Sequence, residues 1–137
     1  MKQIYLIALI ASVIYACQPI VIGTPRKAVQ LPDYDQSTAA GAVYLFKTEL
    51  DSNNIAGAAG LVAKPGRKYL AAETLELYPK IARIKRQFGE RSISALFVDT
   101  LSNDQFKIII EFEDARKMDF LTSRIEDQWF IVLNEDK

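Results

Sequence analysis

The sequence predicts an α+β fold in which N-terminal helices pack on a curved antiparallel sheet of about four strands, preceded by a signal peptide and a tether. Three observations carry this prediction. Before Gly89 the apolar residues recur with a helical period of about 3.6 residues, and after Gly89 they alternate with the period of a strand. The chain also begins with an apolar run over residues 4–16 that has no counterpart later in the sequence.

The composition excludes several kinds of catalytic and metal site. The 137 residues include no histidine and one cysteine, which removes Ser-His-Asp and Cys-His catalysis, histidine ligands, zinc fingers and an intramolecular disulfide. Basic and acidic residues number 17 each, a balance that argues against a dedicated nucleic-acid binder. We therefore expect no cofactor, no metal and no nucleic-acid partner, and the composition favours a protein that is not an enzyme.

The N-terminal segment has the layout of a secretory signal. Lys2 supplies positive charge, an apolar run follows, and small Ala16 comes before Cys17. The run is shorter than the roughly 20 residues that a membrane-spanning helix needs. Its last residues, Ile14-Tyr15-Ala16-Cys17, resemble the lipobox of bacterial lipoproteins, with Tyr15 as a bulky departure from the pattern.

This resemblance implies that residues 1–16 are a signal peptide and that Cys17 is lipidated. Several acyl chains on one cysteine anchor a protein almost permanently, because each buried CH₂ contributes roughly 0.8 kcal/mol. The resemblance also implies a periplasm-facing place in the bacterial cell envelope, with the choice between inner and outer membrane left open. The alternative is a Cys17 that happens to follow a signal.

Residues 17–37 are expected to form a tether between the lipid and a domain over residues 38–137. The segment holds three prolines and one glycine and shows no sustained period. The alternative is that residues 20–22 form a short edge strand on the domain.

Two short helices are expected to open the domain as a hairpin. Ser37 or Thr38 can cap the first, over residues 39–50, and residues 51–54 break that helix and cap a second over residues 55–63. The first helix has apolar residues at helical spacing at Val43, Phe46 and Leu50.

A third helix is expected over residues 69–88, after a turn at residues 64–67 that contains Pro and Gly. Pro79 should divide it into two pieces or kink it, and Gly89 should end it. Its predicted core residues are Ile81, Ile84 and Phe88.

The predicted strands form a meander and occupy residues 92–101, 106–113, 117–126 and 129–133. One face of the first strand carries Ile93, Ala95, Phe97 and Asp99 and is taken as the core face. Alternation fails at residues 120–121, which predicts a bulge there. Trp129 and Phe130 lie on opposite faces of the last strand, so one should enter the core and the other is a candidate for contacting a partner.

Two segments, residues 42–58 (AVYLFKTELDSNNIAGA) and residues 126–132 (EDQWFIV), carry a resemblance to a known family. The first is similar to the first helical hairpin of nuclear transport factor 2-like proteins, and the second to their closing hairpin, an acidic turn followed by a strand that contains Trp. The resemblance spans residues 38–134 and implies a cone-shaped α+β domain with a pocket between helices and sheet. It does not by itself imply catalysis, because one fold supports many functions.

Catalytic members of that superfamily, isomerases and cyclases, would imply an acid or base in the cone. Here the base would be Asp99 or Asp119, and the donor Tyr44, Tyr69 or Tyr78. Asp99 is the stronger choice, since a carboxyl on an apolar face has a raised pKa and can act as a general base. The alternative places Asp99 in water at the end of its strand.

Charge is balanced overall but not locally. Residues 64–91 hold eight basic and three acidic residues, while residues 92–137 hold five basic and ten acidic ones. A basic helix could attract anionic headgroups or cell-wall polymers, and an acidic edge could meet a basic partner. The alternative is a solvated surface. The acids Glu111, Glu113 and Asp114 lack the spacing of a calcium loop.

The sequence therefore predicts a membrane-tethered, non-enzymatic lipoprotein that binds a small apolar ligand or a protein partner in the envelope. One alternative is an isomerase or cyclase that uses Asp99 with a tyrosine. The other is a structural subunit of an envelope complex, assembled as a dimer through its sheet face.

Overall fold

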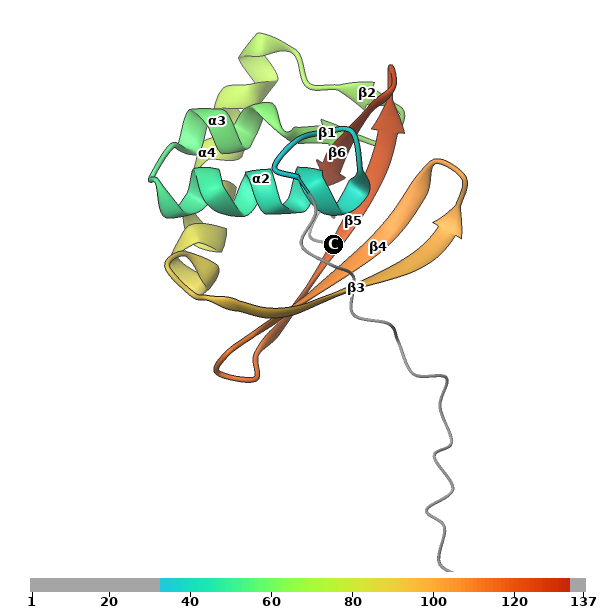
Figure 1. Cartoon of the computed structure of the whole chain (residues 1–137). Coiled ribbons are helices and arrows are strands. Elements are labelled where there is room, and N and C mark those ends of the chain that lie inside the picture. Colours follow the sequence, from blue (N-terminus) through green and yellow to red (C-terminus); the bar gives the residue numbers. More distant parts are fainter. Residues whose placement is uncertain (1–32, 134–137) are drawn as a thin grey trace, which may run out of the picture.

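The computed structural model describes residues 33–133. The predicted signal peptide, Cys17 and most of the predicted tether lie outside the described residues. The chain from residue 33 forms the predicted α+β arrangement, with helices in the first part and most strands in the second (Figure 1). The elements are α2 (Ala39–Asp51), α3 (Ile55–Gly60), β1 (Val62–Lys64), β2 (Arg67–Lys68), α4 (Ala71–Phe88), β3 (Ile93–Ser102), β4 (Gln105–Phe112), β5 (Lys117–Ile125) and β6 (Gln128–Val132).

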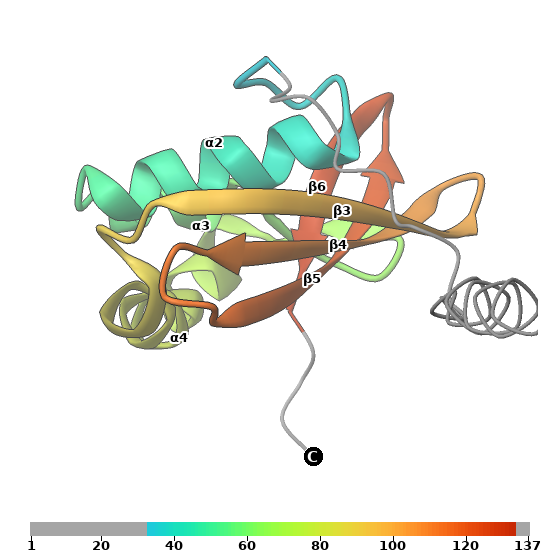
Figure 2. The ribbon, with the colours of Figure 1, turned by 60° about the horizontal axis from the view of Figure 1, so that its bottom comes forward.

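The strands form one mixed sheet of six strands in the order β2-β1-β6-β5-β4-β3. The pair of β1 and β6 is parallel, and the other neighbouring pairs are antiparallel. Figures 1 and 2 show the helices on one side of this curved sheet. The prediction of helices on a curved sheet is confirmed, but the sheet is mixed and has six strands in place of the predicted antiparallel sheet of about four.

The two additional strands come from residues assigned to the end of the second helix and its turn. Helix α3 ends at Gly60, and Val62 pairs with Ile131 of β6. The backbone N–H of Ile131 donates to Leu61 at 2.9 Å, which begins this pairing. The chain then reverses at Gly66, whose positive φ of 79° suits glycine.

Side-chain caps set the starts of the first two helices. Thr38 Oγ1 accepts the backbone N–H of Gly41 at 2.9 Å, and Asn54 Oδ1 accepts that of Gly57 at 3.0 Å. Each bond satisfies a donor that the first turn of a helix leaves without a partner. The predicted helical hairpin is thus confirmed, with a second helix shorter than expected.

Helix α4 runs without interruption through Pro79, so of the two predicted effects of this proline, a division of the helix or a kink, the division is wrong. Leu77 and Ile81 are buried on either side of the proline, and this packing holds both turns against the core. The helix ends at Phe88 before Gly89, as predicted. The ring of Phe88 stacks on Phe112 of β4, with centroids 5.5 Å apart.

The core face of β3 differs from the prediction. A register shift lies between Ile93 and Ala95, and beyond it Leu96 pairs with Ile110. Leu96 therefore belongs to the core, and Ile93 and Val98 pack against it. The shift moves Ala95, Phe97 and Asp99 to the outer face, because one extra residue reverses the side of every residue that follows.

The bulge predicted at residues 120–121 is also wrong. Strand β5 pairs in continuous register with both β4 and β6. The irregularities lie instead in β3, between Ile93 and Ala95 and between Thr100 and Ser102.

The aromatic pair on β6 divides between the two faces, as predicted. Trp129 joins the core and lies 4.9 Å from the Phe106 ring, between centroids. Phe130 lies on the outer face but is also buried, and the Lys68 ammonium lies 5.2 Å from the centroid of its ring. Phe130 is therefore not the exposed aromatic contact that the sequence predicts.

Residues at the end of the predicted tether belong to the domain. Gln36 Nε2 donates to the backbone oxygen of Trp129 at 2.9 Å, and the Trp129 N–H donates to the Gln36 oxygen at 2.9 Å. The segment before α2 is thus fixed to β6. Among residues 33–133, no helix is long and apolar enough to cross a bilayer.

Candidate functional site

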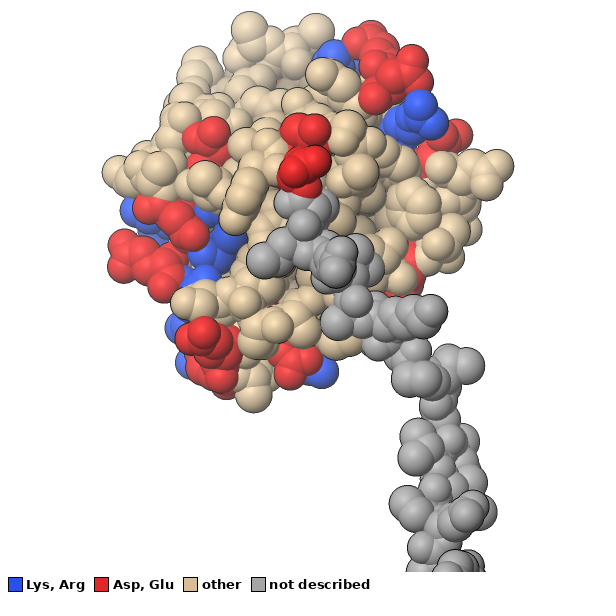
Figure 3. All heavy atoms as spheres, viewed as in Figure 1, with Lys and Arg blue, Asp and Glu red and all other residues tan. Residues whose placement is uncertain are grey.

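An open cleft of about 260 Å³ lies between the C-terminal half of α2 and the start of β3. We call it the α2 cleft. Its lining combines aromatic rings, hydroxyls and charged groups, from Tyr34, Tyr44, Lys47, Thr48, Asp51, Arg91, Ser92 and Ile93. In Figure 3 charged side chains of both signs surround this side of the molecule, while a largely uncharged area covers α2.

The floor of the α2 cleft contains a buried lysine. Lys47 is 7% exposed, and its ammonium contacts both carboxylate oxygens of Asp51, at 2.5 and 2.6 Å. The two residues lie four apart on α2, the spacing that brings side chains together on a helix. Asp51 also accepts the backbone N–H of Glu90 at 2.8 Å, so the pair joins α2 to the loop before β3.

Tyrosines form one wall of the cleft. Tyr44 is buried, and the ring of Tyr34 stands against it edge-on, with centroids 5.8 Å apart. Tyr34 itself is 63% exposed and forms the rim. Burial, and then the neighbouring Tyr34, raise the pKa of the Tyr44 hydroxyl above its ordinary value of 10.0. This hydroxyl therefore stays protonated at neutral pH and can donate a hydrogen bond.

Arg91 forms the opposite wall, and nearby groups hold its guanidinium in place. It makes a close ion pair with Asp114, and its Nε donates to the Gln87 backbone oxygen at 2.8 Å. Each cation of the cleft thus has a carboxylate beside it. The cleft offers donors and acceptors without a strong net charge, which suits a polar partner surface better than an apolar ligand.

The space between helices and sheet is filled by large side chains. One continuous core includes residues from α2, α4 and the sheet. Its largest fully buried members are Phe46, Phe112, Leu50, Ile81, Leu96, Ile108 and Ile110. An apolar ligand entering this space would have to displace core side chains. The α2 cleft and three other surface clefts of the described residues have volumes of about 210–260 Å³, below the roughly 300–1,000 Å³ typical of small-molecule pockets.

The structure does not bring the predicted base and donor together. Asp99 lies on the outer face of β3, in register with Lys107 of β4. Asp119 is exposed and pairs with Lys107 at 2.5 Å. Tyr44 lines the α2 cleft on the other side of the sheet, and that cleft does not include Asp99.

The other two tyrosines predicted as donors, Tyr69 and Tyr78, lie in other parts of the domain. Tyr69 lies under the Lys64 ammonium, 5.1 Å from its ring centroid. Tyr78 packs partly buried against the core. Neither lines the α2 cleft, so of the tyrosines proposed as donors only Tyr44 belongs to the candidate site.

Two of the three acidic residues in and beside the β4–β5 turn, Glu111 and Asp114, form ion pairs. Lys117 contacts Glu111 at 3.3 Å, and Asp114 contacts Arg91 and, at 3.4 Å, Arg116. Within the part of the chain that the structure describes, no three metal-binding side chains gather in one place.

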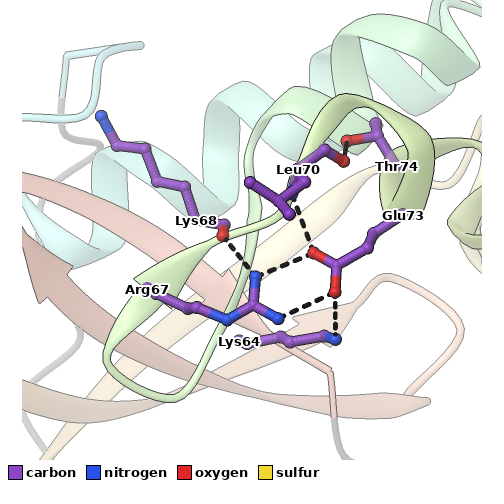
Figure 4. A network of polar contacts seen from close by, with 6 residues as sticks. All are labelled: Lys64, Arg67, Lys68, Leu70, Glu73 and Thr74. Atoms are coloured by element: carbon purple, nitrogen blue, oxygen red, sulfur yellow. Dashed lines mark hydrogen bonds and ion pairs between the residues drawn. The ribbon is translucent and has the colours of Figure 1, made fainter.

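A second polar constellation surrounds Glu73 at the start of α4 (Figure 4). Arg67 binds both its carboxylate oxygens at 2.8 Å, Lys64 donates at 2.8 Å and the Leu70 N–H at 2.9 Å. These contacts, Arg67 first, then Leu70 and Lys64, hold the pKa of Glu73 well below its ordinary value. We call these four residues the Glu73 clamp, because they tie the β1–β2 hairpin to α4.

The sequence reasoning missed Lys47 and Asp51, the central pair of the site. The signal was present, since Lys47 lies between Phe46 and Leu50 on the predicted apolar side of the first helix. A charged residue in that position predicts either a buried ion pair or a partner surface.

No known family model matches the chain, and no curated protein matches it.

Proposed function

We propose that this chain is a lipid-anchored, non-enzymatic protein of the bacterial cell envelope with a nuclear transport factor 2-like domain. The signal-like residues 1–16 and the lipobox-like sequence before Cys17 support the anchor. The helical hairpin, the strand hairpin, the long helix and the final four-strand meander support the domain assignment. A secretory signal before Cys17 would carry the domain across the inner membrane, so the domain is placed on the periplasmic side.

The domain binds a protein partner through the α2 cleft. The filled core and the small surface clefts disfavour the apolar ligand that the sequence leaves open. Tyrosine and arginine are enriched among the residues that dominate binding at protein interfaces. The cleft presents both types at its edges, Tyr34 and Arg91, and a partner side chain entering between them would meet Lys47 and Asp51.

The observation that carries this proposal is Lys47, which is buried at the floor of an open cleft and pairs with the exposed carboxylate of Asp51. Such a pair is weak support for stability, because the desolvation of Lys47 offsets much of its attraction to Asp51. The same pair gives the cleft fixed donors and acceptors, which supply specificity towards a polar partner. Recognition therefore accounts for these residues better than stability does.

Site-specific photocrosslinking in the intact membrane tests both the α2 cleft as a binding site and the alternative of dimerisation through the sheet face. A photoreactive phenylalanine would replace Tyr34 at the cleft, Phe97 on the outer sheet face, or Leu101 at the β3–β4 hairpin. Leu101 is the matched control, since it is also apolar and 56% exposed. We expect a discrete adduct with another protein from position 34 only, and its loss on Arg91→Ala.

Adducts from position 97 to a second copy of the chain would instead favour the structural-subunit alternative, in which sheet faces dimerise. That alternative has its own support, because Phe97 and Ile109 lie side by side on the outer face. Equal adducts at all three positions, or none at 34, would contradict the α2 cleft as the binding site.

The anchor has a separate test: Cys17→Ala should abolish lipid labelling and membrane fractionation, and unchanged labelling would contradict the lipoprotein assignment.

A further inference from the structure

An apolar projection stands at the start of α4, away from the α2 cleft. Leu70 is 67% exposed and Leu75 is 62% exposed, and Ala71 and Ala72, the first two residues of α4, are exposed as well. We call Leu70, Ala71, Ala72 and Leu75 the α4 tip. We propose that the α4 tip docks on the anionic phospholipid surface that holds the lipid anchor. This inference rests on the proposed anchoring at Cys17.

The outward face of α4 continues the tip with basic residues. Leu77 and Ile81 face the core, so the stripe on the opposite side of the helix runs through positions 75, 79, 83 and 86, which are four, four and three residues apart. This stripe is Leu75, Pro79, Arg83 and Arg86, all exposed. Exposed apolar residues next to basic ones suit an anionic membrane surface, because burial of apolar area and attraction to anionic lipids both strengthen such binding.

The cations of this face have no acidic partner within the described residues. Lys80, Arg83 and Arg86 take part in none of the ion pairs formed by residues 33–133. Glu76 is the one acidic residue exposed beside them on α4. Three unpaired cations against one carboxylate favour a negatively charged surface, and lipid headgroups provide such a surface.

The Glu73 clamp keeps the tip outside the core. Leu70 has extended backbone angles, φ −74° and ψ 158°, and its N–H is bound to Glu73. The same carboxylate neutralises Lys64 and Arg67 (Figure 4). The leucine is thus fixed in an outward position beside cations whose charge is already satisfied, so the tip itself is apolar while the free charges lie further along α4.

The position of the anchor allows this contact. Asp33 follows Cys17 by 16 residues, and a chain of that length spans at most about 55 Å. A domain of this size has a radius of gyration of about 13 Å, so α4 can reach the membrane from any point of attachment. A covalent anchor also raises the local concentration of the domain, which makes a small contact surface sufficient.

The test places a fluorescent probe on the tip of the anchored protein. A lipidated Cys17 has no free thiol, so Leu75→Cys introduces the one site that a polarity-sensitive thiol dye can label. The protein, purified with its anchor, is reconstituted in vesicles of phosphatidylglycerol and phosphatidylethanolamine, or of phosphatidylcholine alone. Leu101→Cys is the matched control, because Leu101 has similar exposure on the β3–β4 hairpin.

We expect a blue shift of the Leu75→Cys probe and its quenching by spin-labelled lipid in the anionic vesicles, with neither change for Leu101→Cys. Arg83→Glu with Arg86→Glu should remove most of the quenching. Equal quenching at both positions, or equal quenching in the two lipid mixtures, would overturn the proposal.

Three further outcomes separate the docking surface from the anchor. A protein that floats with the vesicles while its Leu75→Cys probe remains aqueous would overturn the docking surface alone. A blue shift without lipid quenching that fades on dilution would assign the tip to protein contact and would also overturn it. A protein that takes up dye at Cys17 and fails to float would contradict the anchor itself.

Discussion

Helices α2 and α4 show two ways in which a helix is held in this domain. Nine of the 13 residues of α2 are buried, whereas α4 buries two of its 18. Small residues let α2 approach its neighbours on several sides. A Cβ on Gly41, for example, would lie 2.5 Å from the backbone oxygen of Asp35. Helix α4 instead packs along one stripe and is fixed at its start by the Glu73 clamp.

This difference in burial indicates where functional residues can lie on each helix. Nearly every side of α2 contacts the protein, so the group that we propose as functional, Lys47, lies at the floor of a cleft beside the core. Helix α4 has a free outer side, and residues there can change with little effect on packing. Substitutions that follow this division test whether α2 is the centre of the fold and α4 an attached surface element.

The largest loss in the free energy of unfolding is expected for Phe46→Ala in α2. Phe46 is fully buried, and its ring meets Phe120 at a centroid distance of 5.8 Å. Removing a buried ring leaves a cavity and costs about 3–5 kcal/mol. Urea unfolding of the purified protein measures the loss. The matched change on α4, Leu75→Ala, should stay within about 0.5 kcal/mol, because Leu75 lies on the surface. Similar losses for both would contradict the comparison.

A smaller change in the free energy of unfolding is expected for Lys47→Met, although Lys47 is as buried as the core residues around it. Methionine fills a similar volume and needs no desolvation of a charge. Asp51, which keeps the N–H of Glu90 and is 40% exposed at its side chain, remains solvated. The free energy of unfolding should therefore change by less than about 1 kcal/mol, while the adduct from position 34 is lost. A loss of about 3 kcal/mol or more would assign Lys47 a structural role instead.

Local signals in the sequence predict α2 well and parts of β3 and β1 poorly. Thr38, the polar break after Leu50 and the cap at Asn54 act within a few residues, so the sequence alone places the helical hairpin. Strand β1 has three residues, too few to show alternation, and it exists because it pairs with β6 far along the chain. Such pairing is a property of the folded protein and not of the local sequence.

The site residues divide in the same way. Tyr44 is recognisable from the sequence as a potential donor, whereas Asp99 is misplaced because a bulge after Ile93 reverses its face. That bulge depends on the fit of β3 against β4 and leaves no pattern in the sequence. At Pro79 the local signal is present but misleading. Proline favours a break in the helix, and the burial of Leu77 and Ile81 overcomes this preference.

The smallest expected effect concerns the attachment of α4 and depends on pH. The pKa of Glu73 is lowered from an ordinary value of 4.5, first by Arg67, so the ionised form stabilises the folded state. This contribution is fully present above pH 4.5 and is lost as the pH falls towards the lowered pKa. Glu73→Gln should therefore lower Tm at neutral pH, with a gap to the parent protein that closes in acid.

Glu76→Gln provides the control for this measurement, because Glu76 is exposed on the same helix and forms no ion pair within residues 33–133. Thermal unfolding from pH 7 downwards should give parallel curves for this variant and the parent. A gap for Glu73→Gln that stays constant with pH would mean that the shape of the side chain matters and its charge does not. In that case α4 would be held by packing, as α2 is, and the contrast between the two helices would narrow.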